Sequence, residues 1–191
     1  MHELLNNQEE NRTEYLQFIL NSNSPKKIIV SGPGTGKTYT FKQVFLKSQS
    51  NNNLALTFIR KLVNDMSDDF GNLAEVKTFH AFCKKLLHEK RGGFELYPFL
   101  TQIIKEDAAL LGYYFCDFSD HFQLLEDDSQ HIDFYIRRGN YYNAVCFDDS
   151  VYRVLKISEE DPDFIPRYDQ VVIDEYQDFN RLEVATINTS L

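Results

Sequence analysis

The sequence predicts an α/β fold in which helices cover both faces of a parallel sheet. Short β-rich runs alternate with segments of helical spacing over the first 90 residues. A glycine-rich turn, "GPGTGKT", separates the first such run from the helix that follows it. A later apolar run, "QVVIDE", ends in two carboxylates. This alternation favours a parallel sheet, because parallel strands are usually joined by a helix.

The expected elements follow one another in a regular order. Helical spacing before residue 20 ends at "NSNSP". Strands are expected at "KKIIVSG", "NLALTF" and "AEVKTF", and each is followed by helical spacing. The segment from Gly92 to Pro166 is aromatic-rich and mostly helical, and "YDQVVIDE" then returns to the strand pattern. We therefore expect a sheet-forming domain at residues 1–89 and 166–191, with a mostly helical subdomain inserted at 90–165.

Charge is distributed unevenly along the chain. The net charge is −9, and residues 89–165 hold 16 acidic and 7 basic residues, which accounts for all of it. The flanking segments are balanced, with 13 residues of each sign, so they can carry basic patches that suit nucleic acid. Aromatic residues beside Arg137 and Arg138 could stack on bases, but core and rim packing is the more common use of such residues.

Composition also restricts the cellular setting. The sequence has no apolar run long enough to cross a bilayer, and the N-terminus lacks the apolar region of a signal peptide. Cys83, Cys116 and Cys146 form no CxxC pair, so neither a zinc site nor a disulfide framework is indicated. We expect a cytoplasmic protein without a membrane partner.

The sharpest motif is the glycine-rich turn. Its "GKT" ending lies between an expected strand and an expected helix, which is the context of a P-loop, with Ser31 at the first position of the GxxxxGK[ST] pattern. Its glycines turn successive N–H groups toward bound phosphates, and the helix that follows adds its positive end. Lys37 is expected to reach the β- and γ-phosphates of ATP, and the Thr38 hydroxyl to bind Mg²⁺. The predicted phosphate-binding residues are Gly32, Pro33, Gly34, Thr35, Gly36, Lys37 and Thr38.

The late strand supplies the second half of this expected site. Asp174 follows three apolar residues, which places it at the carboxyl end of a buried strand, where open α/β sheets bind ligands. Asp174 is expected to hold Mg²⁺, and Glu175 to orient or deprotonate an attacking water. An aspartate followed by a glutamate favours ATP hydrolysis over transfer to another substrate. A small-molecule kinase is the weaker alternative, because no acceptor site is evident.

Four stretches together resemble the UvrD/Rep-type superfamily-one DNA helicases. They are "VSGPGTGKT", "LALTFIRKLVNDM", "VKTFHAFCKKLL" and "VVIDEYQDFN", and their order and spacing agree with that family. The resemblance covers about residues 26–90 and 167–191. It implies a RecA-like ATP-binding domain with an inserted subdomain, and action on single-stranded DNA.

The resemblance also implies roles for individual residues. Gln177 would sense the nucleotide and couple it to DNA. A glutamine upstream of the P-loop would read adenine; Gln17 is preferred for its distance, whereas Gln8 fits the usual local pattern better. Tyr39, expected at the base, stands where many relatives have arginine. The residues expected along the single-stranded DNA track are Thr57, Phe58, Arg60, Thr78, Phe79 and His80.

The resemblance also implies parts that this sequence does not contain. A following "GDxxQ" strand and a second RecA-like domain with transition-state arginines are both expected in an intact helicase. The sequence therefore predicts the front part of such an enzyme: a truncated frame, an expressed fragment or half of a split system. A missing C-terminal helicase domain, or a partner chain supplying it, is the expected partner. A nucleotide-sensing or protein-interaction module derived from this fold is the alternative.

Overall fold

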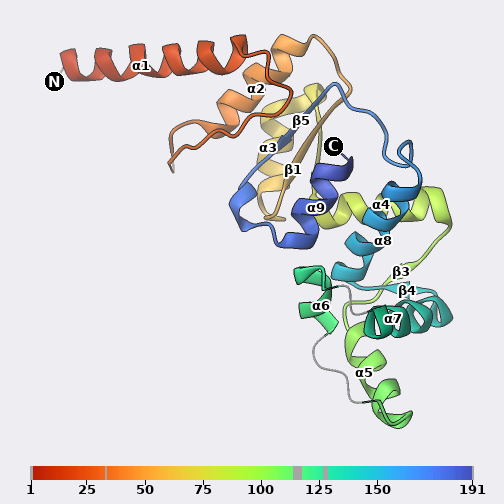
Figure 1. Cartoon of the computed structure of the whole chain (residues 1–191). Helices are drawn as coiled ribbons and strands as arrows, with labels where there is room; N and C mark the ends of the chain where they lie inside the picture. Colours follow the sequence, from red (N-terminus) through yellow and green to blue (C-terminus); the bar gives the residue numbers. More distant parts are fainter. Residues whose placement is uncertain (1, 33, 114–117, 127–128, 191) are drawn as a thin grey trace.

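The computed structural model describes residues 2–32, 34–113, 118–126 and 129–190 of this chain (Figure 1). Its main elements, in chain order, are α1 (His2–Asn21), α2 (Lys37–Ser48), β1 (Asn53–Thr57), α3 (Leu62–Phe70), β2 (Glu75–Thr78), α4 (Phe79–Arg91), β3 (Glu95–Leu96), α5 (Leu100–Leu110), α6 (Phe118–Leu124), α7 (Ser129–Tyr142), β4 (Ala144–Val145), α8 (Phe147–Glu160), β5 (Gln170–Ile173) and α9 (Arg181–Ser190). Short 3₁₀ turns occupy Gly71–Leu73 and Tyr176–Asp178.

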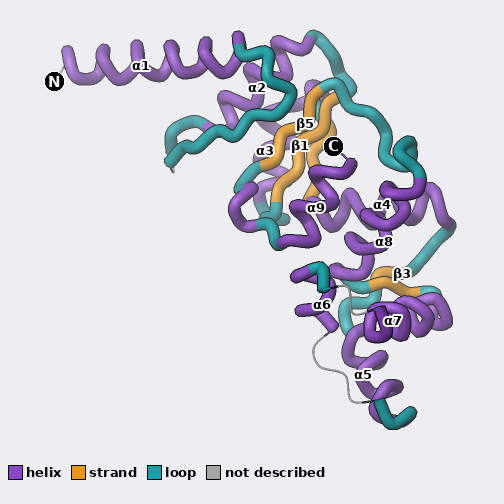
Figure 2. The backbone as a smooth tube through the Cα atoms, in the orientation of Figure 1, coloured by secondary structure: helices purple, strands orange, loops and turns teal. Residues whose placement is uncertain are grey.

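The central sheet has three parallel strands in the order β2-β1-β5 (Figure 2). Thr57 of β1 pairs with Thr78 of β2, and Leu56 pairs with Ile173 of β5. The strands therefore end together, and the residues after them meet at one edge. Helices lie on both faces, so the predicted α/β architecture with a parallel sheet is confirmed.

The side chains of β1 point alternately to the two faces of the sheet, and each face has its own layer of the core. Leu54 and Leu56 point to a large apolar cluster that includes residues of α4, α8 and α9. Ala55, between them, points to a second cluster with Phe45 of α2 and Phe70 of α3. This is the period-2 pattern of a strand, and both faces of β1 are buried because helices cover both.

The expected strand at residues 26–32 was wrong. These residues lie outside any helix or strand, and Ile28 and Val30 are 82% and 95% exposed. Their β-branched side chains suit a strand, but a strand also needs a hydrogen-bonded neighbour. Among the described residues, β5 pairs only with β1, and no strand pairs with residues 26–32.

The segment expected as an inserted subdomain, residues 90–165 and here called the insert, packs on the helices beside the sheet through α8. This helix lies against α4 and α9, and its buried Val151, Val154 and Leu155 belong to the same cluster as Leu54 and Leu56. The parallel pair β3–β4 joins the beginning of the segment to its later part. The mostly helical insert therefore extends one core layer of the sheet domain.

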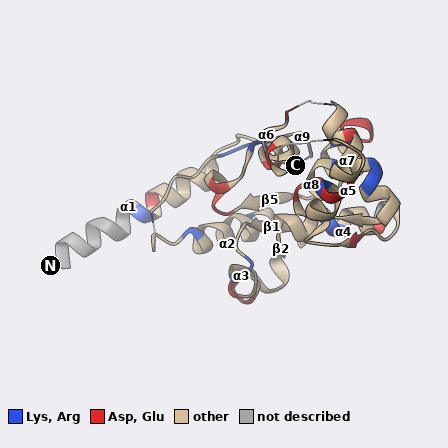
Figure 3. Cartoon of the chain, turned by 90° about the horizontal axis from the view of Figure 1, so that it is seen from below, with Lys and Arg blue, Asp and Glu red and all other residues tan. Residues whose placement is uncertain are grey.

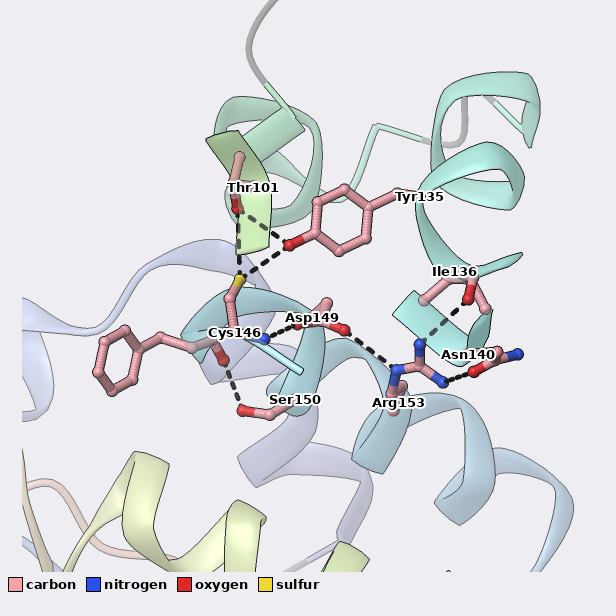
Figure 4. A network of polar contacts seen from close by, with 9 residues as sticks. Thr101, Tyr135, Ile136, Asn140, Cys146, Asp149, Ser150 and Arg153 are labelled. Carbon is pink, nitrogen blue, oxygen red and sulfur yellow. Dashed lines mark hydrogen bonds and ion pairs between the residues drawn. The ribbon is translucent and has the colours of Figure 1, made fainter. Parts of the chain in front are cut away.

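A buried polar network holds the insert together (Figure 4). Asp149 accepts hydrogen bonds from the Cys146 N–H and from Arg153 Nε, the latter at 3.1 Å. Burial raises the pKa of Asp149 to about 6. The Tyr135 hydroxyl bonds to Thr101 and to the Cys146 sulfur. These contacts satisfy polar groups inside the insert, which is a structural role.

Arg138 is paired within the insert. Arg138 Nε donates to Asp107 Oδ2 at 2.7 Å, and its guanidinium also contacts the rings of Tyr141 and Tyr142. Acidic and basic segments occur together around α5 and α7 (Figure 3). The structure thus favours the packing interpretation of the arginine–tyrosine segment over base stacking.

Candidate functional site

The P-loop connects residues 26–32 to α2. Gly34 and Gly36 have φ values of 72° and 88°, in the left-handed region that glycine adopts without strain. The Thr35 hydroxyl donates to the Gly32 carbonyl at 2.7 Å and closes the turn. Gly36 is the residue before α2, so the first N–H groups of this helix point out of its N-terminus. Pro33, also predicted to bind phosphate, lies outside the described residues.

Asp174 and Glu175 lie at the carboxyl edge of the sheet. The Asp174 N–H donates to the Leu56 carbonyl at 2.8 Å, which anchors the end of β5 to β1. Asp174 is 8% exposed, and burial raises the pKa of its carboxyl group. Glu175 has a φ of 53°, an uncommon backbone conformation for this residue type that occurs often at functional sites. It turns the chain sharply, so its side chain points toward the P-loop lysine.

Lys37 joins the two halves of the site. Its ammonium donates a hydrogen bond to Glu175 Oε1 and lies 3.9 Å from Asp174 Oδ1, although 138 residues separate Lys37 from Glu175. This hydrogen bond raises the pKa of Lys37 and lowers that of Glu175. Gln177 donates through Nε2 to Glu175 Oε2. The structure therefore brings Lys37, Asp174, Glu175 and Gln177 together as a connected group.

The residues at this edge suit Mg²⁺ together with a nucleotide. Thr38 supplies a hydroxyl at the start of α2, and Asp174 supplies a partly shielded carboxylate, both oxygen donors of the kind Mg²⁺ prefers. Among the described residues, no group of three or more His, Cys, Asp or Glu side chains could hold a metal without help. Thr38 and Asp174 would thus share Mg²⁺ with the phosphates, and the ion would neutralise charge on them.

The residues predicted to contact DNA fall into two groups. Phe58 is 44% exposed, Arg60 is exposed and His80 is half-buried, so these three can offer surface to a ligand. Thr57 and Phe79 are buried. The Thr57 hydroxyl accepts the Ile59 N–H, and the Thr78 hydroxyl accepts the Ala81 N–H and caps α4. The buried and capping residues support the loops that carry the exposed ones.

His80 links this edge to the insert and to α9. Its ring lies 6.3 Å from that of Phe58 and 5.6 Å from that of Phe147, which is 45% exposed at the start of α8. His80 Nε2 is 3.4 Å from the buried Glu183 Oε1. Burial lowers the pKa of His80 and raises that of Glu183. The sequence reasoning missed Phe147, because only the fold brings it beside His80.

The two residues expected at the base occupy different surroundings. Tyr39 is 52% exposed on the first turn of α2, beside the P-loop. Gln17 is exposed on α1, in a shallow surface region with Glu14 and Phe18. The side chain of Gln8, the alternative to Gln17, lies outside the described residues. Adenine contact by Gln17 therefore stays a prediction.

Comparison with known protein families agrees with this geometry. Residues 17–189 match the model of a family described as an AAA domain (AAA_19). The chain belongs to this family. The family is a P-loop NTPase domain found in UvrD/Rep-like helicases. A comparison with curated proteins finds no match. Within the described residues of this AAA domain, no helix is long and apolar enough to cross a membrane.

Proposed function

We propose that this AAA domain is the ATP-hydrolysing module of a UvrD-like superfamily-one DNA helicase or translocase acting on single-stranded DNA. The observation that carries the proposal is the meeting of Lys37 with Asp174 and Glu175 at the carboxyl edge of the sheet. A P-loop lysine beside an aspartate–glutamate pair combines phosphate binding with water activation. The four helicase-like stretches of the sequence support the finer assignment.

The proposed chemistry assigns one task to each side chain. Lys37 binds the β- and γ-phosphates, and a phosphate that takes its donor from Glu175 releases that carboxylate. Glu175 is then free to orient or deprotonate the attacking water. Gln177 keeps its amide against the second oxygen of Glu175, so it can report the nucleotide state to neighbouring residues. Thr38 and Asp174 would hold Mg²⁺ beside these groups.

The same edge offers aromatic surface for single-stranded DNA. Phe58, His80 and Phe147 form a row of edge-to-face rings with substantial exposure at both ends. Such rings stack on bases, typically for about 1–3 kcal/mol each. Arg60 follows Phe58 by two residues and adds a cation for the backbone. Translocation also needs a domain that closes on ATP, so the proposal includes a second helicase domain as partner.

Single-stranded DNA tests this proposal directly. We expect fluorescein-labelled oligo(dT) to bind, and Phe58→Ala to weaken binding roughly 5- to 150-fold, the equivalent of one lost stacking contact. Phe99→Ala is the matched control, because Phe99 is a 65% exposed aromatic residue of the insert outside this row. If oligo(dT) neither binds nor stimulates hydrolysis, also with a second helicase domain added, the alternative of a nucleotide-sensing or protein-interaction module is favoured.

A further inference from the structure

Helix α1 places an arginine directly on the P-loop. A Cβ atom added to Gly36 would lie only 1.9 Å from Arg12 Nη2 and 3.0 Å from Arg12 Cζ, so the guanidinium rests against the Gly36 backbone. The same guanidinium lies over the ring of Tyr39, with Cζ 5.8 Å from the ring centroid. Arg12 therefore lies between the last P-loop glycine and the first turn of α2.

The position of α1 is fixed by contacts with α2. The two helices are neighbours (Figure 1). Lys47 of α2 donates to the Leu20 carbonyl at the end of α1, and it lies 3.4 Å from Asn21 Oδ1. Lys27 donates to the Ile19 carbonyl at 3.2 Å. These contacts hold the C-terminal end of α1 beside α2, while Arg12 reaches the N-terminus of α2.

The charges around Gly36 favour an anion. The N-terminus of α2 carries the positive end of the helix dipole. Lys37 is also cationic, but Glu175 neutralises it. Among the side chains that the structure describes, no carboxylate pairs with Arg12. The side chain that Arg12 contacts among them is the Tyr39 ring. Keeping an unneutralised guanidinium against a helix N-terminus is electrostatically unfavourable until an anion binds.

We propose that Arg12 is a phosphate ligand of the bound nucleotide. Its guanidinium donates charge-assisted hydrogen bonds to oxygens of the polyphosphate chain, and Tyr39 holds it in place through a cation–π contact. This inference rests on the proposed nucleotide binding at the P-loop. The match to the AAA domain family begins at residue 17, so Arg12 lies before the matched segment. The proposed phosphate ligand therefore lies on the part of α1 that precedes the matched residues.

The test measures binding of Mg²⁺–ATP to the full chain by displacement of a fluorescent ATP analogue. We expect Arg12→Ala to weaken binding by about 3- to 10-fold, a factor kept moderate because the site is exposed. Arg12→Lys should lose less, since it keeps the charge without the planar fork. Inorganic tripolyphosphate should lose affinity by a similar factor in Arg12→Ala, because the contact is to phosphate.

Tyr39 provides a second, independent measurement. Tyr39→Phe keeps the ring that contacts Arg12, so it should lose less ATP affinity than Tyr39→Ala does. In the Arg12→Ala background, Tyr39→Ala should cause little further loss of tripolyphosphate affinity, because that ligand has no base for Tyr39 to contact. Arg137→Ala is the matched control, since the Arg137 side chain is 81% exposed on α7 and its loss should change nothing. Circular dichroism checks that each variant is folded.

Opposite outcomes separate this inference from the proposed function. Unchanged ATP affinity in Arg12→Ala overturns the inference. Tighter binding in that variant also overturns it, because Arg12 would then block the P-loop rather than bind phosphate. A wild-type chain that fails to bind Mg²⁺–ATP, or one whose affinity survives Lys37→Ala, instead overturns nucleotide binding at the P-loop.

Discussion

Glu175→Gln should strengthen ATP binding while abolishing hydrolysis. Glu175 accepts a hydrogen bond from the Lys37 ammonium, so a phosphate that takes this donor competes with a carboxylate. Glutamine keeps the size and the hydrogen-bonding ability of the side chain but carries no charge. The substitution therefore weakens the competitor for Lys37 and removes a negative charge that faces the phosphates.

The size of the gain follows from the exposure of the pair. The Lys37 and Glu175 side chains are 29% and 25% exposed, so solvent screens much of their attraction. Ion pairs of this kind contribute about 0.2–1 kcal/mol, which corresponds to roughly 1.4- to 5-fold tighter ATP binding. Loss of a general base typically lowers turnover by about 10²- to 10⁴-fold. The variant should thus separate binding from chemistry.

Calorimetric titration with Mg²⁺–ATP at two salt concentrations measures this effect. The gain should shrink as salt rises, because it is electrostatic. Glu75→Gln is the matched control: Glu75 pairs with Lys77 and Lys85, but it lies at the opposite end of the parallel sheet from Asp174. Weaker ATP binding by Glu175→Gln than by the wild type would refute the idea that Glu175 competes with phosphate.

Three further predictions concern stability. Phe45→Ala should lower the free energy of unfolding by about 3–5 kcal/mol in urea titrations, because Phe45 is fully buried against Phe70; a loss under 1 kcal/mol would contradict the packing. Thr78→Ala should lower the free energy of unfolding by about 1 kcal/mol, because it removes the hydroxyl that caps α4, whereas Thr78→Ser keeps a capping hydroxyl and should lose little stability. Burial raises the pKa of Asp149 to about 6. The Asp149 carboxyl group therefore holds its proton more tightly in the folded state than in the unfolded state. As pH rises from about 4 to 6, the free energy of unfolding should fall by up to about 3 kcal/mol more in the wild type than in Asp149→Asn. Equal pH dependence in both proteins would contradict this.

The local chemistry of the site was predictable from the sequence. The P-loop residues predict a glycine turn before a helix, and the apolar run before Asp174 predicts a buried strand. The turn and the strand are present, but only Val172 of β5 is buried, because β5 lies at the edge of the sheet. Lys37 and Asp174 were expected to serve one phosphate and Mg²⁺ site, and their charged groups lie 3.9 Å apart. The α/β class followed from the same alternation of strand and helix.

Other features depended on partners that the sequence pattern does not name. Residues 26–32 have strand propensity, but the ladder that makes a strand is a property of two segments. The contact of Phe147 with His80 and that of Arg12 with Gly36 both join segments far apart in the chain. The Asp149 network likewise assembles only when α7 and α8 pack. Local patterns predicted the elements, whereas these contacts required the tertiary arrangement.

Binding of Mg²⁺–ATP by Lys37→Ala is the most direct test of the nucleotide site. The wild type should bind Mg²⁺–ATP, and Lys37→Ala should lose about 10- to 100-fold in affinity, the usual worth of a charge-assisted hydrogen bond to phosphate. Lys42→Ala, which removes a lysine from the same helix α2, should bind like the wild type. Retained affinity in a folded Lys37→Ala protein would contradict the assignment of this site.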